Sequence, residues 1–203
     1  MKNLLLLLLF IPFNCFAQEL NDDGSITKVV NVEITADEIY SKINEWVAET
    51  YNSAEAVTKL NSKSKVITEG TNNVKLKYGK YNIEFKLKHT VSISIRDNKY
   101  KMDLAFGEVT SLGSGSVYDW SKFENEAITY GKKMTKGEYQ EFLKTNLSNA
   151  YKGKKLEKQI KKVAVDGLDK IWGNYEYNCD SIDKMIKSFF NDIENKVSSS
   201  DDW

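Results

Sequence analysis

Apolar and polar residues alternate through the segment YNIEFKLKHTVSISI, which runs from Tyr81 to Ile95. Every odd-numbered position in it is apolar except His89, the only histidine in the chain. Such alternation predicts a β-strand with one buried and one solvent-exposed face. Fifteen extended residues would span about 50 Å, so we expect the strand to curve or break. Lys88–Thr90 is its most polar stretch, and a bend or bulge there would lift His89 partly out of the core.

Neighbouring segments predict further strands that pair antiparallel with this one. Asp97-Asn98 is a tight-turn signal, because both residue types tolerate left-handed backbone angles. Apolar residues then alternate again, at Tyr100, Met102, Leu104 and Phe106. Val91–Phe106 is therefore expected to form a hairpin. Upstream, Lys65–Glu69 and Asn73–Tyr78 predict two short strands separated by Gly70.

A strand over Ser25–Ile34 is followed by the signals of an amphipathic helix. Thr35 and Glu38 have the spacing of a capping box, in which each side chain bonds the other's backbone amide. A stripe at helical spacing follows, formed by Ile39, Ile43, Trp46, Val47 and Thr50. We expect this stripe to pack on the odd-numbered face of the long strand, since both surfaces must leave water.

The second half of the chain predicts three helices. A second capping box, Thr135 with Glu138, opens the first. Apolar stripes predict another helix through Leu156–Trp172 and a last one that begins near Asp180. Between the strands and these helices, Ser111–Ser116 reads SLGSGS and predicts a flexible connector.

The first seventeen residues have the pattern of a secretory signal peptide. Lys2 supplies the positive charge, Leu4–Phe13 a short apolar core and Cys15-Phe16-Ala17 a cleavage site. We expect an exported mature chain, periplasmic or extracellular, that makes no stable membrane insertion after cleavage. Cys15 raises the alternative of a lipoprotein, which we do not expect because Pro12-Phe13-Asn14 lacks the small residue needed just upstream.

Charge and cysteine content limit the classes of partner. The chain has 29 basic and 29 acidic residues, and loss of Lys2 with the signal leaves a net charge of −1. Nothing in this balance points to a nucleic-acid partner. Arg96 is the only arginine, so bidentate recognition of phosphates is poorly supported. Cys179 is the only cysteine after cleavage, which excludes an internal disulfide. We expect a buried or half-buried thiol at a helix start, with an intermolecular disulfide or a reactive thiol as the alternatives.

Four segments together resemble a known family. They are the signal end FAQEL, the strand and helix ITKVVNVEITADEIYSKINEWVAETY, the hairpin VSISIRDNKYKMDLAF and the acidic tail that ends in tryptophan. In these features the chain is similar to a secreted bacterial domain of unknown function, DUF4468, with a TATA-binding-protein-like (TBP-like) fold. The similarity covers roughly Ser25–Leu112. It implies a curved antiparallel sheet backed by helices, no assigned activity and no DNA binding.

Pattern and resemblance together predict an α+β fold: a curved antiparallel sheet with one face covered by helices, followed by a helical C-terminal half. The expected divisions are a signal peptide at 1–17, a TBP-like domain at 18–112, an aromatic connector at 113–134 and a helical region with an acidic tail at 135–203.

No motif specifies a catalytic, cofactor or metal site. The chain has no P-loop, GxSxG or GxGxxG pattern. Asn21–Ser25 lacks the spacing and the distal glutamate of a calcium loop. His89 has no second histidine at a metal-ligand spacing. We therefore interpret His89 as structural and expect neither a cofactor nor a metal.

Two groups of side chains are candidates for a binding surface. Aromatic residues of the connector, Tyr118, Trp120 and Phe123, could form a sugar-binding platform or pack against the helices. Basic residues on the solvent-exposed face of the sheet, Lys86, Lys88 and Arg96, could contact a partner.

These observations favour a non-catalytic binding module of the cell envelope, whose partner is an envelope protein, a peptide or a glycan. The alternative is a periplasmic hydrolase that cleaves a glycan or peptide with carboxylates between the sheet and the helices. The scarcity of histidine and arginine favours the binding module. A pocket with two convergent carboxylates, or a carboxylate paired with His89, would favour the hydrolase.

Overall fold

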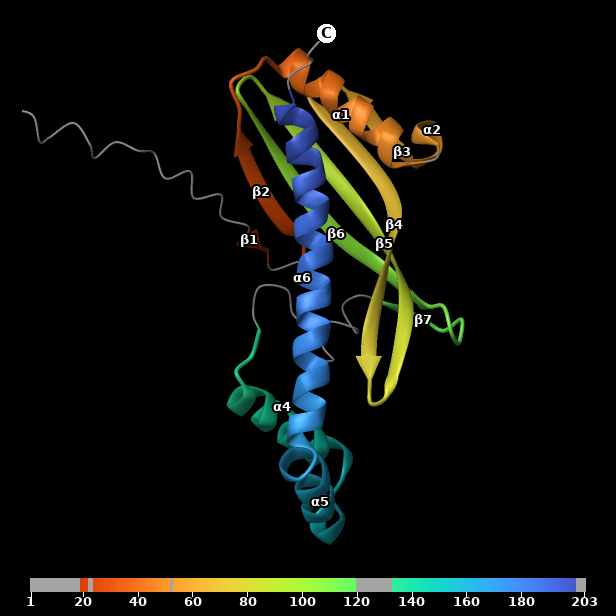
Figure 1. Cartoon of the computed structure of the whole chain (residues 1–203), viewed down its shortest axis with the longest axis vertical. Coiled ribbons are helices and arrows are strands. Elements are labelled where there is room, and N and C mark those ends of the chain that lie inside the picture. The colour runs from red at the N-terminus through yellow and green to blue at the C-terminus, as the bar shows by residue number, and fades with distance from the viewer. Residues whose placement is uncertain (1–18, 22–23, 52, 120–132, 200–203) are drawn as a thin grey trace, which may run out of the picture.

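The computed structural model describes residues 19–21, 24–51, 53–119 and 133–199. Within these residues, seven antiparallel strands form one open sheet, and helices lie against one of its faces (Figure 1). The strand order is β1-β2-β6-β5-β4-β3, and β7 also pairs with β6. The predicted α+β class, with a sheet covered by helices and a helical C-terminal half, is confirmed.

The strands are β1 Glu19–Leu20, β2 Ile26–Asn31, β3 Thr58–Ser62, β4 Lys65–Tyr78, β5 Tyr81–Arg96, β6 Lys99–Ser111 and β7 Val117–Asp119. The helices are α1 Ala36–Thr50, α2 Ala54–Val57, α4 Lys136–Ala150, α5 Gly153–Gln159, the π-helix η1 Ile160–Val165 and α6 Leu168–Ser198.

The long strand β5 runs unbroken through the alternating segment and pairs along its length with β4 and β6. The predicted hairpin with β6 is confirmed, with Asn98 at a φ of 62° in its turn. The two short strands expected around Gly70 are wrong, because they form the single strand β4. Gly70 pairs with His89 in the ladder and does not end the strand. The space that a side chain on Gly70 would need is occupied by Tyr51 and His89.

A β-bulge lies at the predicted polar point of β5. Leu87 pairs with Val109 and His89 with Phe106, so β6 carries one extra residue there. The expectation that the bulge lifts His89 partly out of the core is wrong, since the side chain is only 1 % exposed. The bulge lies in β6, the partner strand, and the side chain of His89 still points to the helix-covered face.

Helices α1 and α6 cover the apolar face of the sheet together (Figure 1). Of the stripe predicted for α1, Ile39, Ile43, Trp46 and Val47 are buried in the core with residues of β5, as expected, whereas Thr50 is exposed. Trp46 of α1 packs edge-to-face on Phe189 of α6, with ring centroids 5.5 Å apart. Lys196 of α6 also bonds Glu45 and Glu49 of α1, at 3.0 and 2.8 Å.

Helix α6 differs from the prediction of a break near Asp180. It runs continuously from Leu168 to Ser198, and no proline interrupts this stretch. The polar residues Asn178 and Asp180 bond Lys77 and Lys133 and do not end the helix. Asp180 bonds Lys133 at 3.1 Å instead of capping a new helix. The apolar stripe that was expected to form a separate last helix therefore packs on the sheet as the second half of α6.

The segment Ser111–Ser116 is a hydrogen-bonded turn in place of the expected flexible connector. The amide of Ser111 donates to the carbonyl of Ser116 at 2.9 Å, and Gly115 has a φ of 69°. The turn brings β7 back onto β6. Of the predicted connector 113–134, residues 120–132 lie outside the described part of the chain. The proposed domain divisions stay a prediction.

Candidate functional site

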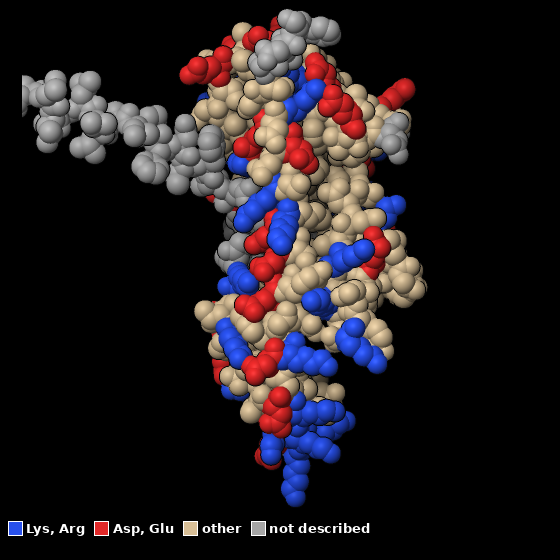
Figure 2. All heavy atoms as spheres, in the orientation of Figure 1, with Lys and Arg blue, Asp and Glu red and all other residues tan. Residues whose placement is uncertain are grey.

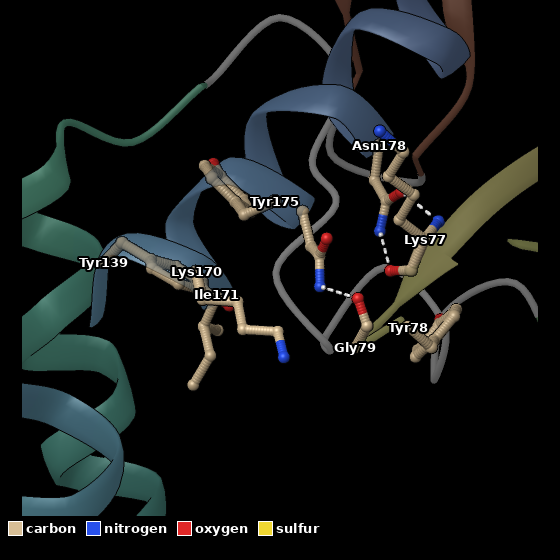
Figure 3. Close-up of a pocket in the computed structure, with 9 residues that line it drawn as sticks. Lys77, Tyr78, Gly79, Tyr139, Lys170, Ile171, Tyr175 and Asn178 are labelled. Carbon is tan, nitrogen blue, oxygen red and sulfur yellow. Dashed lines mark hydrogen bonds between the residues drawn. The ribbon is translucent and has the colours of Figure 1, made fainter. Parts of the chain in front are cut away.

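A pocket lies where the turn of the β4–β5 hairpin meets the N-terminal part of α6 (Figure 3). We call it the hairpin–helix pocket, and its volume is about 370 Å³. Its nine lining residues come from β4 and its turn, from α4 and from α6: Lys77, Tyr78, Gly79, Tyr139, Lys170, Ile171, Asn174, Tyr175 and Asn178. This size falls at the lower end of the range for small-ligand sites.

Two asparagines of α6 fix one wall of the pocket by bonding the backbone of β4 and its turn. Asn178 accepts from the amide of Lys77 at 2.7 Å and donates to its carbonyl at 3.1 Å. Asn174 donates to the carbonyl of Gly79 at 3.2 Å. Asn178 thus bonds this edge of β4 as a neighbouring strand would, and the hairpin is held against the helix (Figure 3).

The stacked rings of Tyr139 and Tyr175 form the opposite wall. Tyr139 of α4 lies on Tyr175 of α6 with centroids 4.4 Å apart, and Trp172 lies 5.1 Å from Tyr175. The Tyr175 hydroxyl accepts from the amide of Met134 at 2.8 Å. Burial raises the pKa of Tyr175 and that of the neighbouring Cys179 thiol. Both groups are therefore neutral at pH 7, and Cys179 is buried as predicted.

The charged groups of the pocket are all cationic. Lys77 and Lys170 line it, and none of the nine lining residues is Asp or Glu. The Lys77 amine lies 4.0 Å above the centre of the Tyr177 ring, and Lys170 has no ion pair within the described residues. An anionic group is therefore the ligand that this pocket would attract.

The candidate basic residues of the sheet lie on the face that the helices leave open. Lys86, Lys88 and Arg96 are exposed and point away from the core. Lys86 and Lys88 are near neighbours, but Arg96 is ten residues from Lys86 and thus about 33 Å along the strand. These three side chains do not form one compact site.

The aromatic candidates do not join that surface. Tyr118 pairs with Val109, which is buried on the helix-covered face. Because paired residues of a ladder project to the same face, Tyr118 points away from Lys86 and Lys88. Trp120 and Phe123 lie outside the described residues.

His89 has one polar partner, the hydroxyl of Tyr51, at 3.1 Å from its Nε2 atom. Its Nδ1 atom has no hydrogen-bond partner among the described residues. Burial lowers the pKa of His89 to about 4, so the imidazole is neutral at pH 7. The ring packs 5.2 Å from Phe189, and a structural role for His89 stays our interpretation.

Two further pockets contain a single acidic residue each, Glu55 in one and Glu33 in the other. Within the described ranges, no group of three or more His, Cys, Asp or Glu side chains could hold a metal ion. None of the helices in that part of the chain is long and apolar enough to cross a membrane.

The hairpin–helix pocket was not predicted from the sequence. Its polar residues Lys170, Asn174 and Asn178 recur every four positions within the apolar pattern of α6. A polar row of this spacing lies along one side of a helix, and it marks a polar contact within an otherwise apolar surface. The sequence predicted one helix up to Trp172 and another from near Asp180, so Asn174 and Asn178 fell between two predicted helices and the row was not recognised.

Comparisons with known proteins agree with the overall fold. Residues 27–106 match the family model of a domain of unknown function (DUF4468) with TBP-like fold. None of the curated proteins compared with the chain matches it.

Two solved structures resemble the whole chain. A DUF4468 family protein from Bacteroides ovatus has a TM-score of 0.55 at 10% identity, covering 94% of this chain and 95% of its own. A TBP-like protein from Parabacteroides distasonis has a TM-score of 0.52 at 13% identity, covering 91% and 99%. At these identities the two structures show the fold alone. Residues 27–106 therefore match the DUF4468 family model, and the chain shares the TBP-like fold of the two solved structures.

Proposed function

We propose that the protein is a non-catalytic binding module that holds a carboxylate-bearing ligand in the hairpin–helix pocket. One observation carries this proposal: the pocket is lined by Lys77 and Lys170 and by no acidic residue. A buried anion in such a site gains charge-assisted hydrogen bonds and meets no repulsion.

The composition of the pocket supports binding over hydrolysis. A glycosidase needs two carboxylates on either side of the bond that it cleaves. The pocket between the hairpin and the helices contains none. His89, the sole histidine, is buried in the core with Tyr51 as its polar partner.

The polar groups of the pocket indicate how a ligand would be held. Lys170 can bond a carboxylate with its amine, because it has no competing ion pair within the described residues. The side-chain oxygen of Asn174 stays available as an acceptor, since its amide nitrogen is the atom that bonds Gly79. Tyr78 adds a partly exposed ring at the rim, on which a sugar or a peptide side chain can pack.

The cell envelope is the proposed location of this binding. The N-terminal pattern of Lys2, an apolar core and the Cys15-Phe16-Ala17 junction supports export and cleavage. Acidic peptides and uronate-containing glycans both carry the carboxylate that the pocket would take. N-terminal mass spectrometry of the exported protein tests this location: a chain that begins at Gln18 supports it, and a diacylglycerol on Cys15 contradicts it.

Isothermal titration calorimetry with an acidic peptide and with a uronate oligosaccharide tests the binding function. We expect at least one of them to bind, and Lys170→Gln to weaken it by about 10-fold or more, the effect of losing a hydrogen bond to a charged group. Lys184→Gln is the matched control, because Lys184 is an exposed lysine of the same helix outside the pocket. Equal affinities for the two variants, or no heat with either ligand, would contradict the proposal.

A further inference from the structure

Five lysines lie along one side of the helical run formed by α5 and η1. They are Lys154, Lys155, Lys158, Lys161 and Lys162, and we call them the lysine stripe. Their spacing of one, four, seven and eight positions from the first places them on a single face of a helix. All five side chains are exposed.

The opposite side of this helical run packs on its neighbours. Ala164 is fully buried, and Leu156, Ile160 and Val163 are partly buried. Gln140 of α4 donates to the carbonyl of Ala164 at 2.7 Å and ties the run to the adjacent helix. The lysine stripe therefore faces away from the rest of the protein.

The stripe lies at one end of an elongated molecule. Helix α5 is the lowest element in Figure 1, beyond the end of the sheet, and Figure 2 shows lysine side chains gathered there on the same face. A flat surface can reach this end without meeting the sheet. Val165, three residues beyond the last lysine of the stripe, is 53 % exposed and adds an apolar contact.

Positive charge is concentrated in this stripe while the whole chain is neutral. Glu157 is the only acidic residue between Lys152 and Val165. Asp166 follows Val165, and the next acidic residues along the chain are paired with other lysines, Asp169 with Lys136 and Glu141 with Lys144. Within the described residues no ion pair neutralises the stripe.

We propose that the lysine stripe docks the protein on a bilayer that contains anionic lipids. Lysine amines on long apolar stems suit the headgroup layer, where the stem packs on lipid and the charge meets phosphate. Nucleic acid fits less well, because the chain's sole arginine, Arg96, lies in the sheet, and the ring of Tyr151 beside the stripe already lies under the Lys155 amine, 4.9 Å from it. This docking is peripheral, and it is independent of the ligand in the hairpin–helix pocket.

Co-sedimentation of the mature protein with vesicles tests the proposal. We expect binding to vesicles with 30% phosphatidylglycerol, none to pure phosphatidylcholine, and a loss of binding as salt rises. Each lysine near an anionic surface is worth about fivefold. Replacement of all five stripe lysines by glutamine should therefore weaken binding at least about 100-fold, and their replacement by arginine should preserve it.

The control variant replaces five exposed lysines elsewhere, Lys75, Lys86, Lys88, Lys99 and Lys184, with glutamine. It makes the same change in net charge and should retain more binding than the stripe variant. Equal losses in both variants, no binding of the unmodified protein, or binding to heparin or DNA but not to vesicles would overturn the proposal. If the stripe variant does not fold, the salt titration of the unmodified protein still decides the matter: binding that persists at high salt would contradict docking by lysines.

Discussion

Gly70 lies directly opposite His89 in the β4–β5 ladder, and the space that a side chain on Gly70 would need is already filled. A Cβ atom there would lie 2.5 Å from Cε1 of Tyr51 and 2.9 Å from Nε2 of His89. The glycine therefore allows the Tyr51 hydroxyl to reach the buried imidazole. The three residues form one packing unit under helix α1.

Gly70→Ala should destabilise the protein by about 1–3 kcal/mol, because the new methyl group must displace Tyr51 or His89 from a well-packed core. Gly107→Ala is the control, since Gly107 lies in β6 and a Cβ there meets nothing within 4 Å. Urea unfolding of the two variants measures the difference. Equal stability of both would mean that Tyr51 and His89 can move apart at no cost.

Stability should fall in mild acid because of His89. Burial lowers its pKa in the folded protein from 6.5 to about 4, so the unfolded chain binds the proton more readily. The contribution of the neutral imidazole is complete above pH 6.5 and is lost as the pH falls from 6.5 to 4. The loss amounts to about 2–3 kcal/mol.

Urea unfolding at half-unit steps between pH 7 and pH 4 measures this slope. His89→Gln removes the titrating group and should flatten the profile, while it lowers stability at pH 7 by about 1–3 kcal/mol by removing the imidazole that the Tyr51 hydroxyl bonds. Ligand binding by the refolded variant should stay unchanged. A profile as steep as that of the unmodified protein would assign the acid sensitivity to other groups.

Trp46→Ala should cost about 3–5 kcal/mol. The side chain is 3 % exposed and packs on both Phe189 and Tyr51, so its removal leaves a cavity between α1, α6 and the sheet. Chemical denaturation gives the value. A loss below about 1 kcal/mol would show that the helices close over the gap.

Asn178→Ala should release the turn end of the β4–β5 hairpin from α6. The side chain makes both hydrogen bonds to the backbone of Lys77, and their loss should cost about 1–3 kcal/mol. Hydrogen exchange of the Lys77 amide should accelerate. Asn191→Ala, an exposed asparagine of the same helix, should leave that amide protected; acceleration in both variants would argue against a local effect.

Local patterns in the sequence predicted most of the sheet and both capping boxes. Period-two alternation identified β5 and β6, and Thr35 with Glu38 marked the start of α1. These features depend on residues close together in the chain. Such short-range signals can be recognised without knowledge of tertiary contacts.

Features that depend on distant contacts were missed. Gly70 suggested an interruption of β4, but the reason for the glycine is Tyr51, nineteen residues away in the chain. Asn178 lies in the stretch that no predicted helix covered, and its partner Lys77 is 101 residues distant. The hairpin–helix pocket lies between these segments, so the spacing of residues in either one alone does not reveal it.

The most direct measurement of the proposed binding is a map of the ligand site by NMR. With an acidic peptide added to the isotope-labelled protein, we predict that amide shifts concentrate at Lys77–Gly79 and at Lys170–Asn178, and that Lys170→Gln abolishes them at the same peptide concentration. Shifts confined to the open face around Lys86, Lys88 and Arg96, or shifts that persist in Lys170→Gln, would contradict the hairpin–helix pocket as the binding site.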